Sequence, residues 1–200
     1  MEPVLYEVDR RILMHIRTLA IIIMMAGFVV PVPVLAQGRH ARQPAEGSIA
    51  VGGDVGVFVP KDSAFNTALA LEGHGDFYLT PRLGVRFGVD WTDPSFQRES
   101  SDSLRQVRVG GDVIYNWEGG KWHPFAGGGV AAHLLQQKDN GHDFGDSESK
   151  LGGAILGGVE YFFNKTATVK GEARYQFVGS TRNGYDPSGL VLLVGLKQYF

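Results

Sequence analysis

The residue types that acyl transfer requires occur around one polar segment of the chain. His133 lies near the end of an apolar run, and Ser147, Glu148 and Ser149 lie at the far end of the polar segment that follows this run. An acyl hydrolase or acyltransferase needs a base within hydrogen-bond reach of an activated hydroxyl group, and a carboxylate that orients the base. The spacing does not put His133 on one strand with either serine. We therefore expect no catalytic residues here and no enzyme, although an acyl hydrolase remains the alternative.

The same segment, KDNGHDFGDSE at 138–148, is rich in side chains whose oxygens bind calcium. It does not meet the D-x-[DN]-x-[DN]-G spacing of a calcium-binding loop. Asn140, Gly141 and Gly145 are instead typical of tight turns in a solvated loop. The polar segment STRNGYDPSG at 180–189 is similar in kind. We expect no metal and no cofactor at either segment, but exposed loops on a rigid scaffold often carry binding sites.

A third group of chemically active side chains lies inside apolar segments, where charged residues are unusual. Its twelve members are Asp54, Glu72, Asp76, Arg86, Asp90, Arg108, Asp112, Glu160, Lys170, Glu172, Arg174 and Lys197. Acids and bases are nearly balanced in number. Two interpretations are open: an ion path that is gated by rearranging pairs, or a structural network. The network is favoured because an unpaired buried charge is costly.

The segments that carry these charges alternate between apolar and polar residues with a period of two, which predicts β-strands. Eight such runs cover approximately 48–59, 69–79, 82–91, 106–117, 124–135, 151–163, 169–177 and 190–200. In the last run, LVLLVGLKQYF, Lys197 shares a face with Gly195 and Tyr199. The run at 124–135 is rich in glycine, and its phase is ambiguous.

Alternation alone does not say which face is inside, but the length and linkage of the runs favour a membrane. Runs of about 10 to 12 residues suit a tilted membrane crossing better than a globular sheet. Their connections alternate between short turns at 80–82, 118–121 and 164–165 and longer loops at 60–68, 93–103, 136–149 and 180–188. Short turns on one side and long loops on the other are typical of outer-membrane β-barrels. Apolar residues then face lipid, and the charged group fills the lumen.

Aromatic residues gather at both ends of the threaded runs, as expected at membrane interfaces. The predicted belts contain Trp91, Tyr115, Trp117, Trp122, Phe125, Tyr161, Phe163, Tyr175 and Phe177. His133, at the outer end of its run, is expected to belong to the belt on the loop side. In a soluble barrel of the lipocalin type, which is the remaining alternative, the apolar face would be the core and these belts would be coincidental.

The beginning of the chain has the features of an export signal. A basic segment is followed by an apolar stretch from Leu19 to Val30, and Val34-Leu35-Ala36 resembles a cleavage site. We expect a signal peptide at 1–36, with Met14 as a candidate start, a polar lead at 37–46 and the barrel at 47–200. Cleavage leaves about 160 residues, enough for one domain. The chain has no cysteine and a formal charge of −2, with no basic stripe for nucleic acid.

The strand pattern, the HPFAGGGVA segment at 123–131 and the terminal Phe200 resemble the family of small eight-stranded outer-membrane barrels. This family includes the OmpA-like transmembrane domain, OmpX, OmpW and the opacity proteins, and the resemblance covers 47–200. It implies that Phe200 is part of the signal read by the barrel-assembly machinery, although Gln198 departs from the family pattern. It also implies a bacterial outer-membrane location, contact with lipid and lipopolysaccharide, and a monomer.

The fold class predicted is all-β, an eight-stranded antiparallel transmembrane barrel with short periplasmic turns. We expect a structural or surface-interaction role that acts through the outer loops and an extracellular ligand. A narrow pore or small-hydrophobe conduit resembling OmpW is one alternative. An enzyme that modifies lipid A is the other.

Overall fold

The computed structural model describes residues 44–98, 101–117, 120–143, 145 and 147–200. The predicted signal peptide and most of the polar lead lie outside these residues. Within the described ranges, no helix has the length and apolarity needed to span a bilayer.

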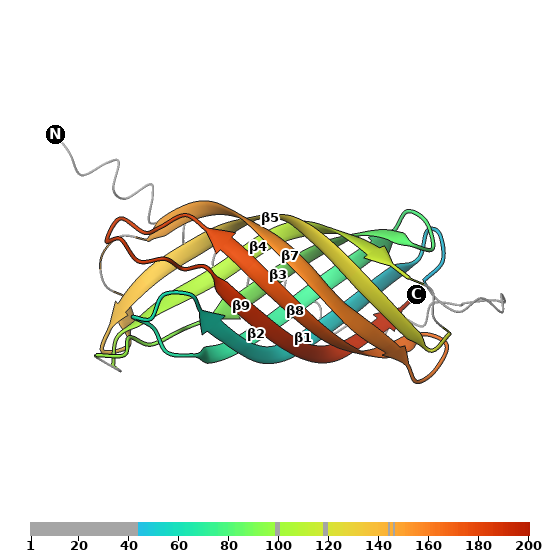
Figure 1. The fold of residues 1–200 in the computed structure, drawn as a ribbon, viewed down its shortest axis with the longest axis horizontal. Helices are drawn as coiled ribbons and strands as arrows, with labels where there is room; N and C mark the ends of the chain where they lie inside the picture. Colours follow the sequence, from blue (N-terminus) through green and yellow to red (C-terminus); the bar gives the residue numbers. More distant parts are fainter. Residues whose placement is uncertain (1–43, 99–100, 118–119, 144, 146) are drawn as a thin grey trace. The chain divides into compact units, whose positions relative to one another are not determined.

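The described chain is a closed antiparallel β-barrel (Figure 1). Its strands are β1 (Ile49–Pro60), β2 (Ala68–Tyr78), β3 (Leu83–Thr92), β4 (Ser103–Asn116), β5 (Trp122–Asp139), β6 (His142–Asp143), β7 (Glu148–Phe162), β8 (Ala167–Val178) and β9 (Gly189–Tyr199). Each long strand pairs with its neighbours along the chain, and β1 pairs with β9 to close the wall. β6 is a two-residue strand that pairs only with the end of β5. The wall therefore has eight strands, as the sequence predicted.

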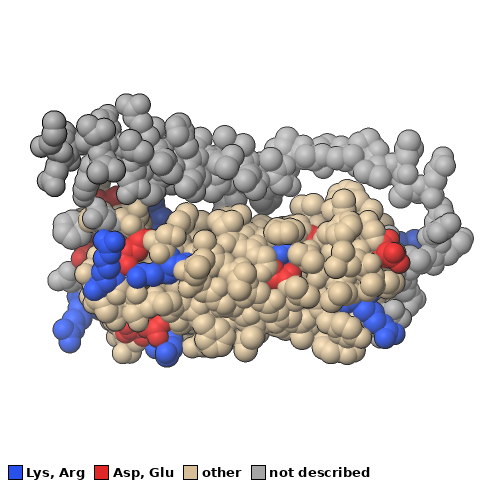
Figure 2. All heavy atoms as spheres, turned by 90° about the horizontal axis from the view of Figure 1, so that it is seen from above, with Lys and Arg blue, Asp and Glu red and all other residues tan. Residues whose placement is uncertain are grey.

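The strand register divides the side chains between the outer face of the wall and the lumen. Val55 pairs with Leu71 on one side and with Val194 on the other, and all three side chains point outward. Their neighbours in the ladder, Asp54 and Glu72, point inward and are buried. Figure 2 shows that the middle of one barrel face is mostly uncharged, with charged side chains concentrated toward its ends. Such a band is energetically favourable against lipid rather than against water.

The hairpin between β5 and β7 differs from the expected long loop at 136–149. β5 has 18 residues and continues to Asp139, where β6 begins to pair back after a two-residue turn. Asn140 and Gly141 occupy this turn with φ of 49° and 80°, as type I′ hairpins require. The expected strand length of about 10 to 12 residues is too short here because backbone pairing needs no apolar face, so the ladder extends beyond the apolar band.

The phase of β5, which the glycine-rich sequence left ambiguous, also becomes fixed. Phe125 is only 2% exposed and packs with Ile114 and Leu156 inside the barrel. Its assignment to the aromatic belt was therefore wrong. His133 has the same inward phase and is fully buried, so it is not a belt histidine either. Pairing with β4 and β7 determines both orientations, and three consecutive glycines carry no side-chain signal of it.

Candidate functional site

The lumen contains all twelve charged residues of the predicted group, and each of them is buried. They form one continuous network of ion pairs from the turn end to the loop end of the barrel. Near the turns, Lys197 bridges Asp76 at 2.8 Å and Glu160. Arg86 then joins Asp76 at 2.8 Å to Glu172 at 2.6 Å. Pairing of this kind offsets part of the desolvation cost of burying the charges, which would be far larger for unpaired groups.

Arg174 connects this half of the network to the other. Its guanidinium donates hydrogen bonds to Glu72 at 2.6 Å, to Asp90 at 2.8 Å and to Glu172 at 2.6 Å. Beyond it, Arg108 joins Asp90 at 2.9 Å to Asp112 at 2.9 Å. Lys170 adds Asp54 to the network, at 3.0 Å from both Asp54 and Glu172. These contacts link strands on opposite sides of the barrel across its axis.

Aromatic side chains pack at the turn end of the lumen. Tyr78, Phe162 and Tyr199 form a buried cluster with Ala50. The hydroxyl of Tyr199 donates a hydrogen bond to Glu160 at 2.6 Å, and the Nζ of Lys197 donates one to the hydroxyl of Tyr78 at 3.2 Å. This cluster therefore both caps the ion-pair network and satisfies its last charges.

Three loops bring a second aromatic cluster together at the other end. Phe65, Phe96 and Tyr185 have ring centroids 4.6 to 5.5 Å apart, and they pack over the inward-facing Leu104 and Leu135. Phe65 is 4% exposed although it lies in a loop. Among the described residues, the lumen is thus closed by apolar packing at both ends. This second cluster was not predictable from the sequence, because its members belong to three separate loops.

An open recess of about 810 Å³ lies outside this second cluster. Its lining comes from the loops at 61–67, 93–102 and 179–188 and from the end of β5. Aromatic side chains (Phe96, Tyr185) lie beside amide side chains (Gln97, Gln137, Asn183) and beside charges of both signs. This mixture suits a polar ligand with apolar faces. We call this feature the outer recess.

The residues considered for acyl transfer are not assembled. His133 lies inside the barrel, where its Nδ1 is 2.7 Å from the amide nitrogen of Gln106. Ser149 pairs with Leu134, points outward and is exposed. The carboxylate of Glu148 accepts hydrogen bonds from the backbone N–H of Arg182 and pairs with Lys150. No described serine forms a hydrogen bond with His133, so the hydroxyl and base that such chemistry needs do not meet.

Most residues of the predicted aromatic belt have side chains on the outer surface of the wall. Trp117, Trp122, Phe163 and Phe177 are 49% to 56% exposed. Tyr115 is 38% exposed, and Trp91, Tyr161 and Tyr175 are partly exposed. Phe200 is 39% exposed at the end of β9, and its N–H donates a hydrogen bond to the carbonyl of Ile49 at 2.8 Å. Its role in assembly stays a prediction.

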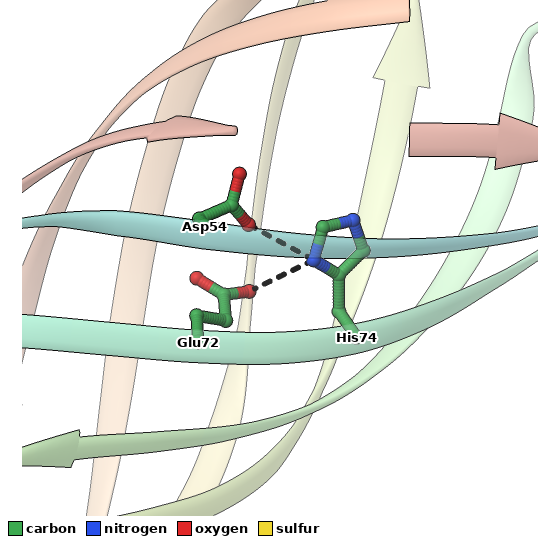
Figure 3. Close-up of side chains that lie close together, drawn as sticks. All are labelled: Asp54, Glu72 and His74. Atoms are coloured by element: carbon green, nitrogen blue, oxygen red, sulfur yellow. Dashed lines mark ion pairs between the residues drawn. The ribbon is translucent and has the colours of Figure 1, made fainter. Parts of the chain in front are cut away.

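One cluster of lumen residues was not predicted from the sequence. Asp54 on β1 and Glu72 and His74 on β2 converge on a common point (Figure 3). Asp54 and Glu72 are direct partners in the ladder, and His74 follows on the same face. Their common inward phase was visible in the alternation, but the register between the two strands was not.

The closed wall, charged interior and apolar exterior agree with a comparison against protein families. The model of the outer membrane protein beta-barrel domain matches residues 23–199. The chain belongs to this family of outer-membrane β-barrel proteins. No curated protein matches its sequence.

Solved structures of other outer-membrane barrels share the fold at low sequence identity. Neisserial surface protein A is 16% identical, with a TM-score of 0.63 over 79% of this chain and 100% of its own. OprG from Pseudomonas aeruginosa is 14% identical, with a TM-score of 0.64 over 80% and 99%. Ail from Yersinia pestis is 13% identical, with a TM-score of 0.52 over 78% and 99%.

Proposed function

We propose that this outer-membrane barrel is a non-enzymatic surface protein that binds an extracellular ligand through its outer loops, with the lumen as a rigid scaffold. The observation that carries the proposal is the contrast between the two regions. The lumen is filled with paired charges and closed by packing at both ends. The loops form a recess of about 810 Å³ with aromatic, amide and charged groups at its surface.

The loops that form the outer recess are held in place, which favours binding by preorganisation. Lys61 pairs with Asp186 at 2.8 Å and joins the first loop to the last. Lys138 pairs with Asp93 and joins the end of β5 to the second loop. The amide of Asn183 donates a hydrogen bond to Gln137 at 3.1 Å.

A protein of similar fold, Ail, has a crystal structure in complex with the heparin analogue sucrose octasulfate.

The test is a binding screen with the barrel in lipid nanodiscs, on arrays of sulfated and neutral glycans that include sucrose octasulfate. We expect at least one class of glycan to bind. Tyr185→Ser, which removes an aromatic wall of the recess, should weaken that binding at least tenfold. Arg182→Ala is the matched control in the same loop because Arg182 does not line the recess. Binding that is unchanged in Tyr185→Ser, or no binding on any array, would contradict the proposal.

A small-hydrophobe conduit is the second candidate, and the outer aromatic cluster is the observation that would favour it. Phe96 and Tyr185 line the recess and pack over the buried Phe65, so a gate for a hydrophobic molecule would lie at this cluster. However, the lumen beneath contains charged side chains rather than an apolar path. Uptake of a hydrophobic dye into vesicles distinguishes the candidates, because a conduit transports the dye and a scaffold does not.

A further inference from the structure

Asp54, Glu72 and His74 form a compact cluster in the lumen, with side chains that are 0% exposed. The Nδ1 of His74 lies 3.0 Å from the Oδ2 of Asp54 and 3.6 Å from the Oε1 of Glu72 (Figure 3). One ligand atom from each residue lies within 4.8 Å of the other two. Gly52 faces His74 and Gly195 faces Asp54 in the ladder, and a side chain at either glycine would collide with the cluster. The barrel wall therefore makes room for it.

Each side chain of this cluster has one polar atom that lacks a hydrogen-bond partner. The Nε2 of His74, the Oδ1 of Asp54 and the Oε1 of Glu72 are buried without a hydrogen bond. The Oδ2 of Asp54, in contrast, lies 3.0 Å from both the Nδ1 of His74 and the Nζ of Lys170. Buried polar groups almost always have a partner, and an unsatisfied one requires an explanation. Three such atoms, one from each side chain of the cluster, indicate that a common partner belongs between them.

The lumen has too little positive charge at the same cluster. The network contains seven carboxylates and five lysine or arginine side chains, an excess of two negative charges. The unsatisfied buried oxygens of these seven carboxylates belong to Asp54 and Glu72. Their cationic neighbours are shared, since Lys170 also pairs with Glu172, and Arg174 also pairs with Glu172 and Asp90. Uncompensated charge in a closed interior is costly.

We propose that this cluster binds one divalent transition-metal cation, for which Zn²⁺ is the appropriate probe. One imidazole and two carboxylates are a suitable donor set for such an ion. A single divalent cation would supply both missing positive charges. With bonds of about 2.1 Å, the ligand atoms of a tetrahedral zinc ion lie about 3.4 Å apart, so the widest pair of ligand atoms, at up to 4.8 Å, needs to contract by up to about 1.4 Å. Lys170 keeps its pairing with Glu172 when the ion takes Asp54.

The test measures zinc in the full processed chain, purified without an affinity tag. The protein is refolded in detergent with or without ZnCl₂, freed of excess ion by gel filtration and analysed by mass spectrometry for zinc. We expect about one ion per folded chain, and at least a tenfold loss in Glu72→Gln and His74→Gln. Glu148→Gln and His142→Gln change the same residue types at the loop end of the barrel, outside the cluster, and should retain the ion.

Several outcomes would overturn the proposal. These are a wild-type chain that retains no zinc, zinc that is retained in both cluster variants, and zinc that is lost in His142→Gln. A zinc-free wild type whose His74 ring carries two protons in a ¹⁵N spectrum would show that a protonated histidine compensates the charge instead.

Two further measurements do not require every variant to fold. X-ray absorption by zinc in the wild type should show one imidazole and otherwise oxygen ligands, and a shell with no imidazole or with several would overturn the proposal. Without metal, Glu72→Gln should resist unfolding at least as well as the wild type, because it removes one excess charge. Added zinc should stabilise the wild type alone. A metal-free Glu72→Gln that is less stable would contradict the charge argument.

Discussion

Arg174 shows at the scale of one residue how the barrel interior is held together. Its guanidinium contacts carboxylates on β2, β3 and β8 at distances of 2.6 to 2.8 Å. The planar fork of arginine suits several carboxylates at once, whereas lysine has no such geometry. Removal of one partner from a buried network leaves the other charges uncompensated. The resulting loss of stability exceeds the contribution of any single ion pair.

Arg174→Ala should therefore destabilise the folded barrel by about 3–5 kcal/mol. The measurement is urea unfolding in lipid vesicles, followed by tryptophan fluorescence. Lys165→Ala, in an exposed turn, is the control and should change the stability by less than about 0.5 kcal/mol. An Arg174→Ala barrel as stable as the control would mean that the network contributes little.

At the scale of single strands, glycines decide how closely the inner wall can pack. Gly56 on β1 points inward, and a methyl group there would collide with the carbonyl oxygen of Leu192 on β9. Gly73 on β2 has open space around the same position. The contrast arises because strands of a small barrel are strongly coiled, so inward side chains crowd while outward ones diverge.

Gly56→Ala should cost about 1–3 kcal/mol of stability through this overpacking, and Gly73→Ala should be tolerated. The fraction of each variant that migrates as a folded band on unboiled gels, measured across a urea series, checks both. Equal behaviour of the two variants would show that the β1–β9 contact relaxes without cost.

The loop elements depend on pH through the pair of Lys61 and Asp186. Burial by itself raises the pKa of Asp186, but the hydrogen bond from Lys61 and those from Ser188 together hold this pKa below its usual value of 3.8. A depressed carboxyl pKa stabilises the folded loops above pH 3.8, and this contribution is lost as the pH falls through the lower folded value. The pKa of Lys61 is raised from 10.5, mainly by Asp186, so its contribution is lost only as the pH rises above that.

Lys61→Met should therefore raise the pKa of Asp186 toward its usual value. Carbon-detected NMR of the side-chain carboxyl group between pH 2 and pH 6 measures it directly. Lys121→Met, at the turn end of the barrel, is the matched control and should leave the titration unchanged. A titration of Asp186 that is the same in both variants would show that the two loops are not tied by this pair.

At the scale of the whole molecule, the sequence predicted the fold because its signal is local. Alternation places Asp54 and Val55 on opposite faces whatever the rest of the chain does. The phase of Phe125 depended on pairing partners across Gly127, Gly128 and Gly129, which carry no side chains. The cluster around His74 depends on the register between β1 and β2. This register could not be predicted, because the sequence does not determine the length of the connection between the two strands.

A barrel that is closed at both ends and acts through its loops should not conduct ions, so its conductance is the most direct test. The measurement is single-channel recording of the wild-type processed chain in planar lipid bilayers, with an open porin as the positive control. Closed ends and a filled lumen predict no current steps above those of a protein-free bilayer. Reproducible steps of defined size would contradict the account and would make the charged network an ion path.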